Sequence, residues 1–350
     1  MQPQNKNGIL DMLKSINLVN FGPLNNLGWS SIGQLNLIIG ENGTGKTFLL
    51  KALYCAMKTL EEYQKGDDKR DAEEILCEKL YWTFQSDKIG DLVTKGSDGG
   101  AMFEAELNDQ SVMRFQWGKD ATKKLLKFAN TSPRRTSNSI FLPAKEVLSL
   151  QKIILKSREE DRSFGFDDTY YDLARVLSFL PSKGKNYRGF SNARKILENF
   201  LGGYIEYDKN QKHWQFKKGN QKFSVSVTAE GIKKIAILDT LLTNRYLRAD
   251  SMIFIDEPEA ALHPTAIMKF LDCMNLLAET GIQIFIASHS YFVVKKLYLI
   301  AQKAGFPVSV LNATQNGTWE QHDLKDGIPD NPIIDESIRI YKEEVEIKFQ

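Results

Sequence analysis

Cysteine is scarce in this chain of 350 residues, which has only three: Cys55, Cys77 and Cys273. They are scattered and none belongs to a Cys-x-x-Cys pair, so the sequence offers neither a disulfide framework nor the ligand spacing of a zinc site. An odd number of scattered cysteines is typical of a protein in a reducing compartment. We therefore expect a cytoplasmic protein.

Long apolar runs and a strong net charge are also lacking. No stretch approaches the roughly 18 consecutive apolar residues of a membrane-spanning helix. Residues 1–7 are polar, without the apolar core of a secretory signal. We expect no membrane partner. With 46 basic and 44 acidic residues the net charge is +2, so any basic surface for nucleic acid has to be local.

The sequence does contain a phosphate-loop motif. Residues 40–47 read Gly-Glu-Asn-Gly-Thr-Gly-Lys-Thr and fit G-x-x-x-x-G-K-[ST] without a mismatch, between an apolar strand pattern and a helix pattern. The N–H groups of such a loop surround phosphates, and the helix N-terminus adds a positive dipole end. We predict that Lys46 reaches the β- and γ-phosphates of ATP and that Thr47 holds Mg²⁺. The other loop residues expected to contact the nucleotide are Asn42, Gly43, Thr44 and Gly45. A plain glycine turn before a helix is the alternative.

A pair of carboxylates follows a second apolar strand pattern at residues 252–255. Ligands bind at the carboxyl ends of parallel strands, where Asp256 and Glu257 would lie. We predict that Asp256 helps to hold Mg²⁺ and that Glu257 is the base that polarises the attacking water. The alternative is an acidic first turn of the next helix.

Asp256 lies 209 positions after Thr47, a gap wide enough for an antiparallel sheet and a helical subdomain. Strand patterns before residue 145 and helical patterns near 146–157, 168–179 and 190–201 supply both. We expect an α/β fold and divide the chain into three parts. These are residues 1–145, with the phosphate loop and antiparallel strands; residues 146–227, a helical subdomain with a following β-hairpin; and residues 228–350, the C-terminal lobe.

Residues 254–264 resemble the Walker B and D-loop segment of ABC-type ATPases, especially the prokaryotic SMC, RecF and OLD-like ATP-binding proteins. The resemblance extends from Leu13 to about Phe292. It implies an ABC-type P-loop NTPase with a mixed sheet, an antiparallel β subdomain and an inserted helical subdomain. His289, 32 positions after Glu257, matches the histidine that contacts the γ-phosphate in this family. A polar strand cap is the alternative.

Residues 228–234 resemble the signature motif of the same family, although Thr228 replaces the usual serine and Glu230 precedes Gly231. In that family the signature meets the γ-phosphate of the other subunit. The resemblance therefore implies that Thr228, Glu230 and Gly231 close over ATP in a head-to-tail homodimer or higher oligomer. A capped amphipathic helix is the alternative. The family's glutamine loop is not evident, and Lys145, Glu146 and Gln151 remain candidates for its place.

Two basic stretches, residues 119–135 and 183–194, are candidates for binding nucleic-acid phosphates. For the first, the alternative is a solvated helix face with Leu125, Leu126 and Phe128 turned inward. The second has the same ambiguity.

The resemblance implies an ATPase that closes a dimer around ATP, opens it on hydrolysis and controls a partner. About sixty residues follow His289, the residue of the family's H-loop, and these are too few for a nuclease domain. His213 and His322 are isolated, so they do not form the histidine cluster of an HNH-like nuclease. We therefore expect the effector, a nuclease or toxin, on a separate chain, by analogy with bacterial anti-phage defence. A RecF-like clamp on DNA is the alternative. The ATPase of a membrane transporter fits least, because the signature is atypical.

Overall fold

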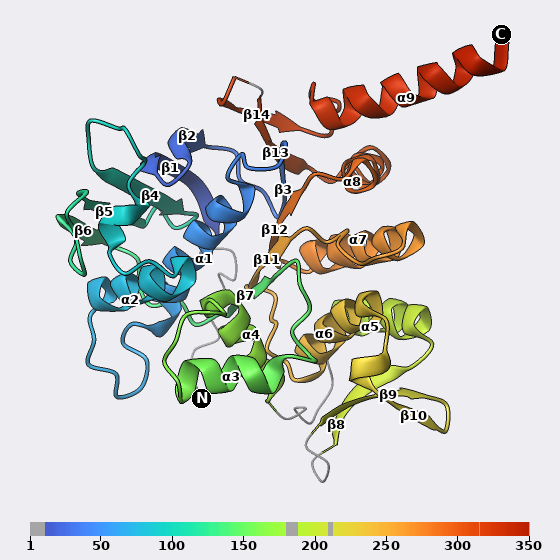
Figure 1. Ribbon diagram of the computed structural model, residues 1–350, viewed down its shortest axis with the longest axis horizontal. Coiled ribbons are helices and arrows are strands. Elements are labelled where there is room, and N and C mark those ends of the chain that lie inside the picture. The colour runs from blue at the N-terminus through green and yellow to red at the C-terminus, as the bar shows by residue number, and fades with distance from the viewer. Residues whose placement is uncertain (1–10, 180–187, 209–212, 315, 350) are drawn as a thin grey trace.

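The computed structural model describes residues 11–179, 188–208, 213–314 and 316–349. Its centre is a six-stranded sheet in the order β14-β13-β3-β12-β11-β7, parallel except for the β13–β14 pair (Figure 1). Its strands are β3 (Leu35–Ile39), β7 (Ser139–Leu142), β11 (Met252–Asp256), β12 (Gln283–Ser288), β13 (Val308–Ala313) and β14 (Trp319–Asp323). Most of these strands are buried along their whole length because elements cover both faces of the sheet.

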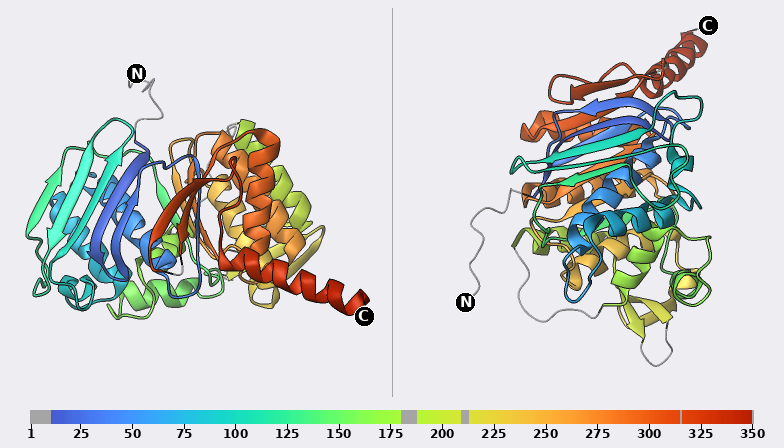
Figure 2. Two further views of the ribbon diagram at one scale, coloured as in Figure 1. Left: turned by 90° about the horizontal axis from the view of Figure 1, so that it is seen from above. Right: turned by 90° about the vertical axis from the view of Figure 1, so that its left-hand side faces the viewer.

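A second sheet of five antiparallel strands has the order β2-β1-β4-β5-β6. Its strands are β1 (Leu13–Phe21), β2 (Leu24–Trp29), β4 (Ala101–Leu107), β5 (Val112–Trp117) and β6 (Lys127–Asn130). Buried and accessible residues alternate along β4, as expected when one face meets a core and the other meets water. The sheet therefore covers one side of the molecule (Figure 2).

Helix α1 (Lys46–Glu62) lies between the two sheets, beside α2 (Ala72–Phe84). Alternate residues of β11 serve opposite cores: Phe254 packs on the side of α1, whereas Ile253 and Ile255 pack on the other face. Phe254 stacks on Phe285 of β12 at a ring-centroid distance of 5.1 Å. The six-stranded sheet thus separates two hydrophobic cores, which we call the α1 core and the distal core.

Helices α6 (Glu230–Thr243), α7 (Pro264–Glu279) and α8 (Tyr291–Ala304) contribute to the distal core. The middle of the chain adds α3 (Gln151–Glu159), α4 (Asp168–Leu177), α5 (Arg188–Leu201) and a small sheet of β8 (Tyr204–Asp208), β9 (His213–Lys218) and β10 (Gln221–Ser224). Helix α9 (Pro332–Phe349) extends away from the body (Figure 1). Among the described helices, none is long and apolar enough to cross a membrane.

Several local predictions are wrong. The helix expected from residue 146 begins at Gln151, and the β-hairpin expected before residue 228 ends at Ser224 and is followed by a 3₁₀ turn, η2 (Val225–Val227). Helix α2 and strands β2, β6 and β14 were not predicted. The three strand patterns are short or polar, so pairing with distant segments decides them, whereas the apolar residues of α2 are spread around more than one face.

The first basic stretch does not form the helix that its alternative reading required. It contains β6, and Leu126, expected to face inward, is 71% exposed. Arg135 is only 1% exposed and pairs with Glu61 of α1, so it cannot belong to a nucleic-acid surface. In the second stretch, residues 183–187 lie outside the described part, and Arg194 pairs with Glu198 and Asp239.

Candidate functional site

The phosphate loop joins β3 to α1 and depends on glycine. Gly43 and Gly45 have φ of 82° and 96°, which disfavours residues with a side chain. A Cβ at Gly45 would lie 2.9 Å from side-chain carbons of Pro23 and Leu24. No side chain of the described residues caps the N-terminus of α1, so its first N–H groups are suited to an anion.

Lys46 lies under this loop. Its ammonium donates to the backbone oxygens of Gly40 at 2.9 Å and Glu41 at 2.7 Å. Burial lowers the pKa of Lys46, and the carboxylates of Glu257 and Asp256 partly oppose that shift. Thr44 donates its hydroxyl to Glu41 O at 3.0 Å, which helps to shape the turn.

Thr47 and Asp256 meet although they are far apart in sequence. The Thr47 hydroxyl lies 2.9 Å from both carboxylate oxygens of Asp256. The contact follows from the sheet order, because β12 alone separates β3 from β11 and their carboxyl ends share one edge. Burial raises the pKa of Asp256 to about 6, and the Thr47 hydroxyl and the charges of Lys51 and Lys234 only partly oppose that shift. A hydroxyl and a carboxylate are hard oxygen donors that fit Mg²⁺.

Glu257 lies just beyond β11 in a left-handed backbone conformation, with φ of 46°. Its N–H donates to Ala287 O at 2.9 Å, which ties it to β12. His289, after the end of β12, places Nδ1 3.3 Å from Glu257 Oε1 and 3.8 Å from Glu259 Oε1. Glu259 in turn accepts from the Ser288 hydroxyl at 2.8 Å. The structure therefore brings the predicted base and the predicted H-loop histidine together.

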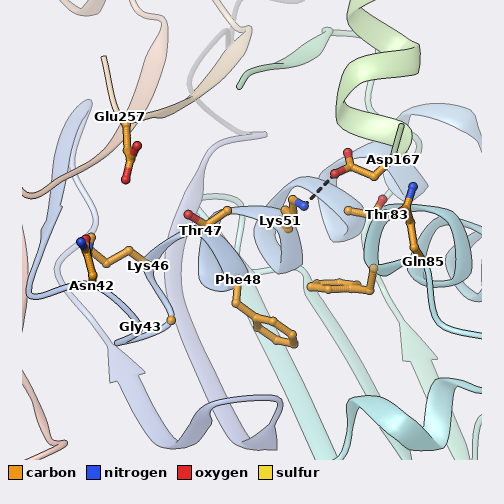
Figure 3. Close-up of a pocket in the computed structure, with 12 residues that line it drawn as sticks. Asn42, Gly43, Lys46, Thr47, Phe48, Lys51, Thr83, Gln85, Asp167 and Glu257 are labelled. Atoms are coloured by element: carbon orange, nitrogen blue, oxygen red, sulfur yellow. Dashed lines mark hydrogen bonds and ion pairs between the residues drawn. The ribbon is translucent and has the colours of Figure 1, made fainter. Parts of the chain in front are cut away.

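A cavity of about 410 Å³ opens at the phosphate loop (Figure 3). Glu257 lies across it from Asn42 and Lys46. The residues lining it are Asn42, Gly43, Gly45, Lys46, Thr47, Phe48, Lys51, Thr83, Phe84, Gln85, Asp167 and Glu257. Loop residues and the predicted base therefore share one open space, large enough for part of a small polar ligand.

The signature residues lie elsewhere. Of the described residues lining the cavity, none is Thr228, Glu230 or Gly231. The Thr228 hydroxyl donates back to Ser224 O at 3.1 Å, and Glu230 is exposed at the start of α6. A Cβ at Gly231 would lie 2.8 Å from Ala261 O, so this glycine permits close contact between α6 and the segment after the carboxylate pair.

The three candidates for the glutamine loop do not line the cavity either. Lys145 is exposed, Glu146 lies 3.5 Å from Lys233, and Gln151 is buried and accepts from Trp214 Nε1 at 2.6 Å. Lys51 and Asp167 do line it and form an ion pair of 2.7 Å. The sequence reasoning missed this pair, because nothing local links the two positions.

Lys234 is a further residue that the sequence reasoning missed. It lies on α6, and its ammonium donates to Glu257 O at 2.7 Å. The oxygen of Ala144 lies 3.4 Å away. Burial lowers the pKa of Lys234 to about 8. The sequence held one sign of this role: Lys234 lies on the same face of α6 as the apolar residues, and that face is expected to be buried. Lys234 ties the signature helix to the backbone of the predicted base.

Comparison with known proteins shows that a family model matches half of the chain. The model described as "AAA domain, putative AbiEii toxin, Type IV TA system" matches residues 120–295. Septu protein PtuA of Bacillus mycoides (strain KBAB4) is 25% identical over 276 residues, which cover 72% of this chain and 34% of that protein. Old nuclease of Escherichia phage P2 is 44% identical over 43 residues, 12% of this chain and 7% of that protein. The chain thus spans about a third or less of these relatives.

Solved structures of SMC heads share the fold. An SMC head bound to the C-terminal winged-helix domain of ScpA has a TM-score of 0.53 at 13% identity, covering 89% of this chain and 97% of that one. The Pyrococcus furiosus Smc head with an extended coiled coil, bound to the C-terminal domain of ScpA, has 0.50 at 10%, covering 95% and 99%. The expected ABC-type α/β fold is confirmed.

Proposed function

This chain belongs to the AAA-domain family whose model spans residues 120–295, and on that premise we propose that it is an ATP-hydrolysing switch. The observation that carries the proposal is the contact between Thr47 and Asp256, at 2.9 Å to both carboxylate oxygens. It joins the phosphate loop to the acidic end of β11, as a Mg²⁺-ATP site requires.

Thr47 and Asp256 would hold Mg²⁺, and Lys46 would exchange its two backbone partners for phosphate oxygens. Asn42, Gly43, Thr44 and Gly45 would line the phosphate chain with backbone N–H groups. When bound, Mg²⁺ would neutralise charge on the β- and γ-phosphates. The raised pKa of Asp256 supports this assignment, since a buried carboxylate gains most from a nearby cation.

Glu257 would orient the attacking water and accept its proton. His289 would contact the γ-phosphate, because its Nδ1 lies 3.3 Å from Oε1 of Glu257, a residue that lines the cavity. Lys234 and Ala287 fix the backbone on both sides of that carboxylate. Hydrolysis of this kind depends mainly on positioning and charge stabilisation.

We further propose that each ATP is shared by two protomers in a head-to-tail homodimer or a higher oligomer. The support is that Thr228, Glu230 and Gly231 lie outside the cavity of their own chain, while α6 begins with uncapped N–H groups suited to a γ-phosphate. A second protomer would supply this helix N-terminus.

Subunit mixing tests the shared site. Gly231 is unsuitable for substitution because any side chain displaces Ala261, so the exposed Glu230 is changed to Trp and Lys46 to Ala in a second preparation. Each variant alone should hydrolyse ATP at background. A mixture should regain activity, because a mixed dimer contains one site with an intact loop and an intact signature. Folded variants whose mixture stays inactive would contradict the shared site.

The switch would control a separate effector, a nuclease or toxin, in bacterial anti-phage defence. The similarity to Septu protein PtuA and Old nuclease, and the family description, support this role. Phage plating on cells that express the chain with its neighbouring genes tests it. Protection should be lost with Lys46→Ala and restored by the wild-type chain. Equal protection by the variant would exclude an ATP-dependent role.

A RecF-like clamp on DNA is a second candidate function. One observation favours it: the lysines of residues 119–127 are exposed beside the exposed Leu126. A salt series separates the two functions. ATP-dependent binding to duplex DNA with a steep salt dependence would favour the clamp. Binding of a protein partner without DNA affinity would favour the switch.

A further inference from the structure

The ion pair between Lys51 and Asp167 connects the ATP cavity to the helical middle of the chain. Lys51 lies one helical turn after Thr47 on α1, and its ammonium is 2.7 Å from Asp167 Oδ2. The two side chains are 22% and 10% exposed. Asp167 is the only residue of the middle segment that lines the cavity within the described chain (Figure 3). A polyphosphate here would therefore bring negative charge close to an ammonium that already has a carboxylate partner.

Asp167 also organises the start of α4. It is the N-cap of that helix, and its Oδ1 accepts from the N–H of Thr169 at 2.8 Å. Its backbone oxygen accepts from the N–H groups of Tyr170 and Tyr171, both at 3.1 Å. The Asp167 carboxylate thus binds Lys51 through one oxygen and the first turn of α4 through the other. Loss of the Lys51 contact would therefore weaken the hold of Asp167 on that turn.

The loop before Asp167 is tied to the same wall of the cavity. With its carboxamide oriented to satisfy its neighbours, Gln85 accepts from Gly165 N at 3.0 Å and Asp167 N at 3.2 Å. Gln85 itself lines the cavity at the end of α2. The start of α4 is therefore positioned by side chains of α1 and α2.

Further along α4, polar contacts continue between the two hydrophobic cores. Tyr54 donates to Asp172 Oδ2 at 2.7 Å, and Lys79 of α2 lies 3.4 Å from Asp168 and 3.5 Å from Asp172. The opposite side of α4 contributes Leu173 and other apolar residues to the distal core. We call this polar contact zone the α4 seam; it comprises Lys51, Tyr54, Lys79, Asp167, Asp168 and Asp172. Ion pairs can exchange partners, whereas close-packed apolar side chains resist displacement.

We propose that Lys51 and Asp167 are positioning residues that report ATP occupancy to α4. ATP in the cavity competes with Asp167 for the Lys51 ammonium, weakens their pair and loosens the first turn of α4 along the seam. The order of the first turn of α4 then depends on whether ATP is bound. This inference rests on the proposed function, since it requires ATP at the phosphate loop.

Hydrogen exchange of α4 tests the proposal, with Glu257→Gln as the background so that saturating Mg²⁺-ATP is not consumed. ATP should speed exchange of the amides of residues 169–171 by about threefold or more. Asp167→Asn removes the charge but keeps a good N-cap. In that variant, and in Lys51→Met, exchange should already be fast and ATP should not change it. The double variant should add nothing to either single change, because both remove the same pair.

Asp161→Asn, an exposed change in the preceding loop, is the matched control and should respond to ATP like the background protein. ATP binding and thermal stability are measured for every variant, so a lost response is not mistaken for lost binding or unfolding. A full ATP response in Asp167→Asn or Lys51→Met, or no response in the background protein with ATP bound, would overturn the inference and leave the proposed function intact. Absence of ATP binding in the background protein would overturn both.

Discussion

Glu257 is held in a conformation that non-glycine residues seldom adopt, and the contacts around it explain how. Its φ of 46° is maintained by the bond from its N–H to Ala287 and by the bond from Lys234 to its oxygen. Such backbone positions cluster at functional sites, where surrounding structure offsets their cost. At the scale of single residues, the contacts of the Glu257 backbone therefore determine the direction in which its carboxylate points.

Glu257→Gln should slow ATP hydrolysis by about 10²–10⁴-fold, because the amide cannot accept the proton of the attacking water. ATP should remain bound and closed oligomers should accumulate. Phosphate release and light scattering with ATP measure the two effects. The exposed Glu320→Gln is the control. Unchanged turnover in Glu257→Gln would remove this residue as the base.

Lys234→Met should change the pH dependence of stability. The folded-state pKa of Lys234, about 8, lies below its ordinary value of 10.5 because of burial. The unfolded chain therefore binds this proton more tightly. The unfolding free energy of the wild type should rise between about pH 8 and pH 10.5 and fall as pH drops through about 8, by at most about 3 kcal/mol relative to the variant. Urea titrations at about pH 7.5 and about pH 9.5 compare the two proteins; parallel pH dependence would contradict the shifted pKa.

At the scale of helices and strands, some elements are determined by their local sequence pattern and others by pairing with distant strands. The apolar runs of β3, β11 and β12 were predictable because a strand buried on both faces is apolar throughout. Edge strand β6 was not, since its four residues include Lys127 and Asn130 and only pairing with β5 defines it. The phosphate-loop motif and the carboxylate pair could be recognised from the sequence alone. Lys51 and Asp167 did not, because their meeting depends on how α1 packs beside α4.

Helix α2 shows how a cap fixes an element that its apolar pattern does not. Asp71 accepts from Glu74 N at 2.8 Å, and Glu74 Oε2 accepts from Asp71 N at 3.1 Å. Asp71→Ala should lower the unfolding free energy by about 0.5–2 kcal/mol. Denaturant titration measures the loss, with the exposed Asp120→Ala as control. An equal effect of both changes would mean that the cap does not stabilise α2.

At the scale of the whole molecule, the site consists of segments that lie far apart in the sequence, from the phosphate loop to Glu257 and His289. The division at residues 145 and 227 stays a prediction, and so does the dimer. In Glu257→Gln with ATP, removal of Mg²⁺ by a chelator should return oligomers to protomers, because the charges of phosphate and Asp256 are then uncompensated. Light scattering before and after chelation measures this. Oligomers that persist without metal and nucleotide would point to an interface unrelated to ATP.

The position of β3 in its sheet has a consequence for synthesis. Among the described strands, Leu35–Ile39 pairs only with β12 and β13, which begin about 250 and about 270 residues later in the chain. A nascent chain on the ribosome carries the phosphate loop early but cannot seat it until residues near 313 have emerged. Folding of such long-range pairings is slow and leaves apolar strands exposed meanwhile. Nucleotide capture should thus be one of the last abilities that a newly made molecule acquires.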